Sequence, residues 1–190
     1  MRVSFFILYL KKFNYLFDYV KILNMKKNQM KSYLKQGLLV IVFFVLDQIT
    51  KFLITSNFRL GESLTIIKGF FNITYVRNTG AGFSILEGHM VFFYLISVVA
   101  LGVLGYMLYN SQKEPTIVRI GILLMISGTL GNFFDRIVNH YVVDFLDFII
   151  LGYDFPVFNV ADICLTVGVL LFILEFILEK KEGLNNANHQ

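Results

Sequence analysis

Two aspartates in the C-terminal half of the chain are the residues best suited to chemistry. Asp144 lies in the apolar run Val142-Val-Asp-Phe, and Asp162 closes the segment Phe158-Asn-Val-Ala-Asp at the start of another apolar stretch. Two carboxyl groups held close together cannot both ionise cheaply, so the pair can retain one proton. The ionised member can then take a proton from water while the protonated member polarises a carbonyl, which is the chemistry of aspartic proteases.

Each aspartate also has a purely structural interpretation. If residues 142–148 form a helix, Asp144 and Asp147 lie roughly on one side and can be the solvated acids of an amphipathic surface segment. Asn159 can cap a helix, and Asp162 would then lie in its first turn, where the helix dipole favours an anion. This interpretation leaves unexplained why a second acid, Asp144, enters from the same side.

Two more pairs of polar residues stand four apart, the spacing that places side chains on one helix face. Asp47 precedes Lys51 in the order that favours an ion pair, so the simplest interpretation is a salt bridge that ends an apolar segment. The functional interpretation is that the pair is the interaction partner of another polar group nearby. Asn132 and Arg136 form the second pair. The amide of Asn132 must either be buried with a hydrogen-bond partner or lie at the edge of the membrane.

Glycines accompany two of these polar groups. Gly128 and Gly131 precede Arg136 and can let two helices pack closely. Gly80 and Gly82 flank Ala81 within Arg77-Asn-Thr-Gly-Ala-Gly-Phe-Ser and allow a tight turn. The second group lacks the lysine spacing of a phosphate-binding loop, so by itself it indicates only a turn.

Other catalytic chemistries have little support. His89, His140 and His189 are scattered without the spacing of metal ligands, so we expect neither a metal nor a cofactor. Cys164 is the only cysteine, lies inside an apolar stretch and is expected in the core. Ser84 with His89 does not make a catalytic triad.

The composition indicates a membrane protein. Hydrophobic residues make up 56% of the 190 residues and charged residues only 16%, with 21 Phe and no Trp. The mean hydropathy is +0.67. This composition excludes a disordered chain, a collagen-like fibre and a disulfide scaffold, and it is a poor fit to a water-soluble enzyme.

Four apolar segments are close to the roughly 20 residues that a helix needs to cross a bilayer. They span about residues 34–54, 90–109, 117–134 and 157–178. We therefore expect an all-α bundle of four transmembrane helices. An Asp at the centre of such a helix raises the free energy of membrane insertion by about 2.5–3.5 kcal/mol. A polar residue at this depth therefore indicates a structural or functional role.

The distribution of Lys and Arg predicts the orientation. Twelve lie in residues 1–35, in the connector 110–119 and in the tail after residue 179, whereas four lie in residues 55–89 and 135–156. Both termini are therefore expected in the cytoplasm, with residues 55–89 and 135–160 outside. The same clustering explains the net charge of +4 better than nucleic-acid binding does.

The remaining segments complete the expected organisation. The β-branched and aromatic run 64–76 predicts one or two short strands on the outer membrane surface. Residues 1–29 are either a basic amphipathic surface helix or a stretch upstream of the true start, for which Met30 is a candidate. The expected domains are thus this extension, a four-span domain over residues 30–180 and a polar tail over residues 181–190.

Five segments match, in order, the motifs of the bacterial lipoprotein signal peptidases, also called type II signal peptidases. They are Asp47-Gln-Ile-Thr-Lys51, Asn78-Thr-Gly-Ala-Gly-Phe-Ser84, Gly131-Asn-Phe-Phe-Asp-Arg136, Val142-Val-Asp-Phe-Leu-Asp147 and Phe158-Asn-Val-Ala-Asp162. The resemblance covers about Met30 to Leu178. The chain departs from the family pattern at Gly82, where the family usually has Ala.

The resemblance implies an aspartic endopeptidase in the bacterial cytoplasmic membrane, with its site at the outer face. Its substrate would be a prolipoprotein, cut before a cysteine that carries a diacylglyceryl group. The two family catalytic aspartates fall on Asp144 and Asp162. Residues that position the substrate or support the pair fall on Asp47, Lys51, Asn78, Gly80, Asn132, Arg136 and Asn159.

The expected partners are this prolipoprotein and membrane lipid, with no nucleic acid, and the enzyme is expected to act as a monomer. The alternative function is a proton-coupled transporter that uses the paired acids as a relay. It is the weaker interpretation, because these acids lie at one face of the membrane rather than at its midplane, where transport sites usually lie.

Overall fold

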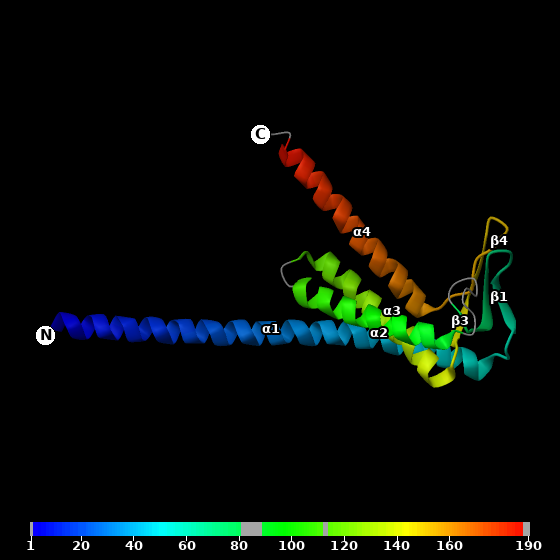
Figure 1. The fold of residues 1–190 in the computed structure, drawn as a ribbon, viewed down its shortest axis with the longest axis horizontal. Coiled ribbons are helices and arrows are strands. Elements are labelled where there is room, and N and C mark those ends of the chain that lie inside the picture. Colours follow the sequence, from blue (N-terminus) through cyan, green and yellow to red (C-terminus); the bar gives the residue numbers. More distant parts are fainter. Residues whose placement is uncertain (1, 81–88, 112–113, 188–190) are drawn as a thin grey trace. The chain divides into compact units, whose positions relative to one another are not determined.

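The structure is a computed structural model that describes residues 2–80, 89–111 and 114–187, with side chains described at 25, 27, 29–80, 89–111 and 114–180. Its elements, in chain order, are α1 (Arg2–Asn57), β1 (Ser63–Ile67), β2 (Phe71–Asn78), α2 (Met90–Asn110), α3 (Thr116–Asn139), β3 (Val142–Ile150), β4 (Tyr153–Asp154) and α4 (Val160–Ala187) (Figure 1). The chain divides into two units, Met1–Leu39 and Val40–Gln190, and the sheet and the site described below belong to the second.

Four helices within the described residues are long and apolar enough to cross a membrane, which confirms the prediction of a four-span membrane protein. Their spans are Gln29–Asn57, Met90–Asn110, Thr116–Asn139 and Val160–Lys180. The third runs five residues past the predicted end at Phe134. Asn132 and Arg136 therefore lie inside the helix rather than at its exit.

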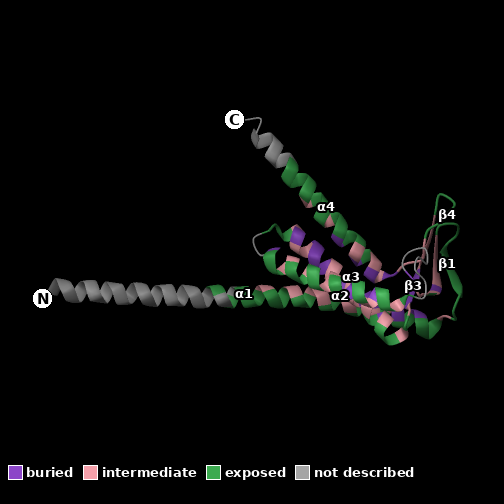
Figure 2. Ribbon diagram, in the orientation of Figure 1, coloured by how far each residue is buried: buried purple, intermediate pink, exposed green. Residues whose placement is uncertain are grey.

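The α3 helix is the centre of the bundle. It packs against both α2 and α4, and 56% of its apolar window is buried, against at most 17% in the other spans (Figure 2). Small residues bring α3 close to α4: a Cβ on Gly121 would lie 2.8 Å from the carbonyl oxygen of Gly168, and a Cβ on Gly128 would clash with the carbonyl oxygen of Ala161. The prediction that Gly128 serves helix packing is confirmed.

The segments between α1 and α2 and between α3 and α4 form one antiparallel sheet in the order β1-β2-β3-β4. Of the one or two strands expected within residues 64–76, the structure has two, β1 and β2, and Gly69 at φ 74° lies in their turn. Leu151 and Gly152, both at positive φ, join β3 to β4 as the primed turns of two-residue hairpins require.

The helical interpretation of residues 142–148 is wrong, because this segment is the strand β3. Its β-branched and aromatic residues suit a pleated surface, and it pairs with β2 along most of its length. In a strand, residues three apart face opposite sides, so Asp144 and Asp147 do not share a face.

A hydrophobic cluster packs the sheet against the end of α1. Ile54 near the end of α1 packs with Tyr75 of β2 and with Val143 and Phe145 of β3, all buried. The segment that leads from β4 to α4 is also fixed to the sheet, because the backbones of Leu146 and Phe158 exchange hydrogen bonds of 2.8 and 3.1 Å. This contact places the start of α4 beside β3.

Candidate active site

Three side chains accept hydrogen bonds from backbone amides at the start of α4. Asn159 caps the helix as predicted, since its Oδ1 accepts the backbone N–H of Asp162 at 3.0 Å, and the Asp162 carboxylate accepts the N–H of Asn159 at 3.2 Å. Asp47 of α1 accepts the N–H of Ala161 at 2.9 Å. These bonds satisfy amide groups that a helix start leaves open, and they fix the direction of the Asp162 side chain.

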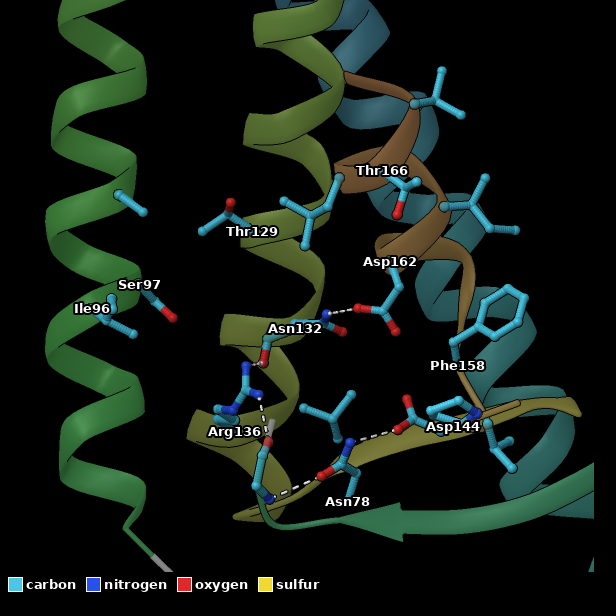
Figure 3. Close-up of a pocket in the computed structure, with 18 of the residues that line it drawn as sticks. Asn78, Ile96, Ser97, Thr129, Asn132, Arg136, Asp144, Phe158, Asp162 and Thr166 are labelled. Atoms are coloured by element: carbon cyan, nitrogen blue, oxygen red, sulfur yellow. Dashed lines mark hydrogen bonds between the residues drawn. The ribbon is translucent and has the colours of Figure 1, made fainter. Parts of the chain in front are cut away.

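Asp144 lies on β3 opposite Val76 of β2 and is almost fully buried. Its carboxylate accepts hydrogen bonds from Asn78 Nδ2 at 2.9 Å (Figure 3) and from Asn159 Nδ2 at 2.6 Å. Burial raises the pKa of Asp144 to about 7, and the negative charge of Asp162 adds to the rise against the two amide donors. Near neutral pH this carboxyl group can therefore hold a proton.

Two amides link the predicted aspartates. Asn159 Nδ2 donates to Asp144 and also lies 3.1 Å from Asn132 Oδ1. Asn132 Nδ2 donates to Asp162 Oδ1 at 2.8 Å (Figure 3). The chain of contacts thus runs from one carboxylate to the other through side chains of α3 and α4. The structure brings together four of the residues that the sequence singled out.

A buried charge cluster lies beside this chain of amides. Lys51 Nζ is 2.8 Å from Asp47, which confirms the predicted ion pair, and it is also 3.1 Å from Asp135 and 3.0 Å from Asn132 Oδ1. All four residues are buried. The pair therefore contacts buried residues of α3 and does not merely end a helix at the membrane edge.

Asp135 is the main residue that the sequence analysis missed. Its carboxylate accepts the backbone N–H of Val143 at 3.0 Å, one residue before Asp144, and it also contacts Lys51 and Gln48. It therefore ties the strand that carries Asp144 to the charge cluster. The available signal was its spacing of three from Asn132, which places both on one helix face.

Arg136 and Gly80 lie on the other side of the cavity that contains the two aspartates. The Arg136 guanidinium donates to the carbonyl oxygen of Gly80 at 3.2 Å and covers the ring of Phe93 at 4.7 Å. The N–H of Gly80 in turn donates to Asn78 Oδ1 at 2.9 Å. Gly82 and Ser84 of the same motif lie outside the described residues.

A cavity of about 690 Å³ joins these groups. Its polar end holds Asp144, Asp162, Asn78, Asn132 and Arg136, and its walls continue along α2, α3 and α4 with mostly apolar side chains (Figure 3). Asp147 does not line it, because its carboxylate accepts hydrogen bonds from Thr74 and Asn72. Within the described residues, no group of three His, Cys, Asp or Glu has the geometry of a metal site.

The description "Signal peptidase (SPase) II" belongs to the family model that matches residues 39–178. The lipoprotein signal peptidases of Staphylococcus aureus strains bovine RF122 / ET3-1 and JH9 are each 42% identical over 156 residues, which cover 80% of this chain and 96% of the relative. The chain belongs to the signal peptidase II family. This membership confirms the resemblance that the five motifs carry.

Solved structures agree with the fold of this signal peptidase II family member. A bacterial membrane enzyme solved by the in meso method at 2.3 Å resolution matches with a TM-score of 0.73 and 39% identity, over 78% of this chain and 90% of that one. A second, at 1.9 Å resolution, matches with a TM-score of 0.68 and 40% identity, over 75% and 92%. The protein is thus a multi-pass membrane protease of the signal peptidase II family.

Proposed function

We propose that this protein removes signal peptides from prolipoproteins by an aspartic mechanism, cutting the peptide bond before a diacylglyceryl-modified cysteine. The observation that carries the proposal is the shared cavity, where two linked carboxylates lie at the end of an apolar space between membrane helices. In this substrate one cysteine carries both the scissile peptide bond and the two acyl chains. The peptide bond suits the polar end of the cavity, and the acyl chains suit its apolar walls. The names of the relatives, lipoprotein signal peptidases, support the same substrate class.

The two aspartates are assigned different protonation states. Asp162 accepts the amides of Asn132 and Asn159 at a helix start, and these donors stabilise its negative charge. Asp144 holds the shared proton, in keeping with its pKa of about 7. The pair titrates as a unit, so its apparent pKa values belong to both carboxyl groups together.

Hydrolysis then follows from these states. The Asp162 carboxylate takes a proton from a water molecule, and the water oxygen attacks the scissile carbonyl carbon. Asp144 gives its proton to the carbonyl oxygen as that oxygen becomes tetrahedral. When the C–N bond breaks, the proton taken from water passes to the leaving amine, the amino group of the lipidated cysteine. A hydroxyl proton of the intermediate returns to Asp144 as the new carboxyl group forms, so the pair regains its shared proton.

The support for the pair comes from the residues around it. Asn78 and Asn159 orient the carboxyl group of Asp144, and Asn132 orients that of Asp162. Arg136 holds the Gly80 turn over the cavity and leaves a positive charge near the reacting carbonyl. Asp47 and Lys51 act on the pair indirectly. Asp47 accepts a hydrogen bond from the start of α4, and Lys51 donates one to Asn132.

We assign the site to the outer face of the bacterial cytoplasmic membrane, with both termini in the cytoplasm. The basis is the excess of Lys and Arg in the two terminal segments and the connector 110–119 over the segments that form the sheet. A Ser63→Cys variant tests this orientation, because Ser63 is exposed at the start of β1 and the native Cys164 is buried. An impermeant thiol reagent should label it in intact cells. Labelling only after lysis would reverse the assignment.

The direct test of function is cleavage of a lipidated precursor by the purified protein in detergent. The matched control is the same precursor with an unmodified cysteine, which should be cut far more slowly because it cannot fill the apolar walls of the cavity. Failure to cut the lipidated precursor, together with proton uptake coupled to a solute in vesicles, would instead favour the proton-coupled transporter.

A further inference from the structure

The cavity carries three hydroxyl groups on its apolar walls, and one of them differs from the other two. Ser97 of α2 donates to the carbonyl oxygen of Phe93 at 2.7 Å, and Thr129 of α3 donates to that of Met125 at 2.7 Å. Thr166 of α4 also lines the cavity and is exposed there, and within the described residues its hydroxyl makes no hydrogen bond. Its proton is therefore free for a ligand.

The position of Thr166 makes this hydroxyl unusual. It lies in the membrane-spanning part of α4, where no bulk water satisfies polar groups, so a free hydroxyl is unfavourable until it finds an acceptor. Its side chain is directed along α4 toward the carboxylate of Asp162 (Figure 3). The hydroxyl thus lies in the cavity between its polar end at Asp162 and the deeper apolar walls.

The depth of Thr166 identifies the acceptor. It follows Asp162 by four residues, which is one helical turn and about 6 Å farther into the membrane. If the scissile carbonyl lies at Asp144 and Asp162, the substrate continues inward through the cysteine side chain, the thioether and the glyceryl group. The glyceryl oxygens carry the two ester carbonyls. Each of these carbonyl oxygens can accept a hydrogen bond, and the ester group has no hydrogen to donate.

We propose that Thr166 donates a hydrogen bond to an ester carbonyl of the diacylglyceryl group and so selects ester-linked over ether-linked lipid. The proposal rests on the proposed function, and it adds a binding contact below the site of cleavage. The apolar walls hold the acyl chains without regard to their linkage, because they recognise area rather than specific atoms. Thr166 supplies the directional contact.

The test uses two synthetic precursors that differ only in the lipid, one with a diacylglyceryl cysteine and one with a dialkylglyceryl cysteine that lacks both carbonyl oxygens. The parent enzyme should cut the diester with a KM about three- to tenfold lower than that of the diether, the range of one net hydrogen bond. The kcat should be similar for both, since the contact is the same before and during the reaction.

Three variants locate the preference. Thr166→Val keeps the shape and removes the hydroxyl, so it should raise the KM of the diester to that of the diether. Thr166→Ser keeps a hydroxyl and should retain the preference. Thr129→Val is the matched control in the same cavity, and the ratio of the two KM values should stay that of the parent, because its hydroxyl is already bonded to Met125.

Each result separates the possibilities. Equal KM values for the two precursors with the parent enzyme, or an undiminished preference in Thr166→Val, would overturn the role of Thr166 while leaving the proposed function standing. If the parent enzyme cuts neither lipidated precursor, the proposed function itself fails and the role of Thr166 fails with it. Should Thr166→Val not fold, the parent comparison and the Ser variant still decide the question.

Discussion

The ammonium group of Lys51 lies 3.0 Å from Oδ1 of Asn132. An ammonium can only donate, so this contact directs the oxygen of the Asn132 amide toward Lys51 and its nitrogen toward Asp162, to which it donates at 2.8 Å. Lys51 thus sets the direction of an amide that holds one of the two proposed catalytic carboxylates. A residue that touches no reacting atom still decides the geometry of the site.

Replacing Lys51 by Met tests this role. The change leaves the carboxylates of Asp47 and Asp135 buried without their counter-charge, which typically costs about 3–5 kcal/mol. We expect a large fall in the thermal unfolding temperature in detergent. Lys68→Met is the matched control, because Lys68 is exposed at a β-turn and its loss should change stability by about 0.5 kcal/mol or less. Similar midpoints for both variants would contradict the charge cluster.

The contact between α3 and α4 can be tested at Gly128. A Cβ there would meet the carbonyl oxygen of Ala161, at the start of the helix that carries Asp162. Gly128→Ala should therefore destabilise the protein by about 1–3 kcal/mol and lower activity with it. Gly102→Ala on α2 is the control, since nothing lies within 4 Å of its Cβ position, and it should be neutral or slightly stabilising. Equal tolerance at both positions would argue against this packing.

Arg136 is expected to need its planar guanidinium. Its separate nitrogens reach the carbonyl oxygens of Gly80 and Asn132 while its face covers Phe93, and lysine cannot reproduce that arrangement. Arg136→Lys should lower kcat/KM about tenfold to hundredfold by misplacing the Gly80 turn. Arg77→Lys makes the same change on an exposed residue of the sheet and should stay within a few-fold of the parent. Full activity of Arg136→Lys would assign that residue to an exposed surface role.

The pH dependence follows from the shared proton. Asp144 has a pKa raised to about 7, first by burial and second by the charge of Asp162. As the pH rises through this value the pair loses its proton, so the rate should fall on the alkaline side of a bell-shaped profile. In Asp162→Asn the repelling charge is gone, and the pKa of Asp144 should move down. Infrared titration of the protonated carboxyl measures that shift, and an unchanged or higher midpoint would contradict the coupling.

Much of the membrane part of the fold could be predicted from the sequence. The four spans follow from runs of apolar residues, because a helix in lipid must be apolar over a fixed length. Asp47 with Lys51 and Asn159 with Asp162 were also predictable, since an ion pair at spacing four and a capping residue depend on local geometry alone.

The strand β3 could not be predicted in the same way. Its run Val-Val-Asp-Phe-Leu-Asp-Phe has no clear alternation of polar and apolar residues, because Val142, Val143, Asp144 and Phe145 are all buried and both faces of the strand are covered there. Only pairing with β2, distant in sequence, makes it a strand. Asp135 escaped notice for a similar reason, since its partners Lys51 and Val143 are brought to it by tertiary packing.

The central claim is that Asp144 and Asp162 act together as the catalytic pair. Asp→Asn at either position keeps the shape of the side chain and removes its acid or base function. Each single variant should lose about a hundredfold or more in the rate of cleavage. The double variant should be little worse than either, because residues that act as a unit are not additive.

Asp147 is the internal control for this claim. It lies on the same strand, is also acidic, and contacts Thr74 and Asn72 on the opposite face rather than the cavity. The decisive measurement is the rate at which purified Asp144→Asn, Asp162→Asn and Asp147→Asn proteins cut the diacylglyceryl-modified precursor in detergent. The account predicts near-complete loss in the first two and much of the parent rate in the third. Near-parent cleavage by a folded Asp144→Asn or Asp162→Asn protein would contradict it.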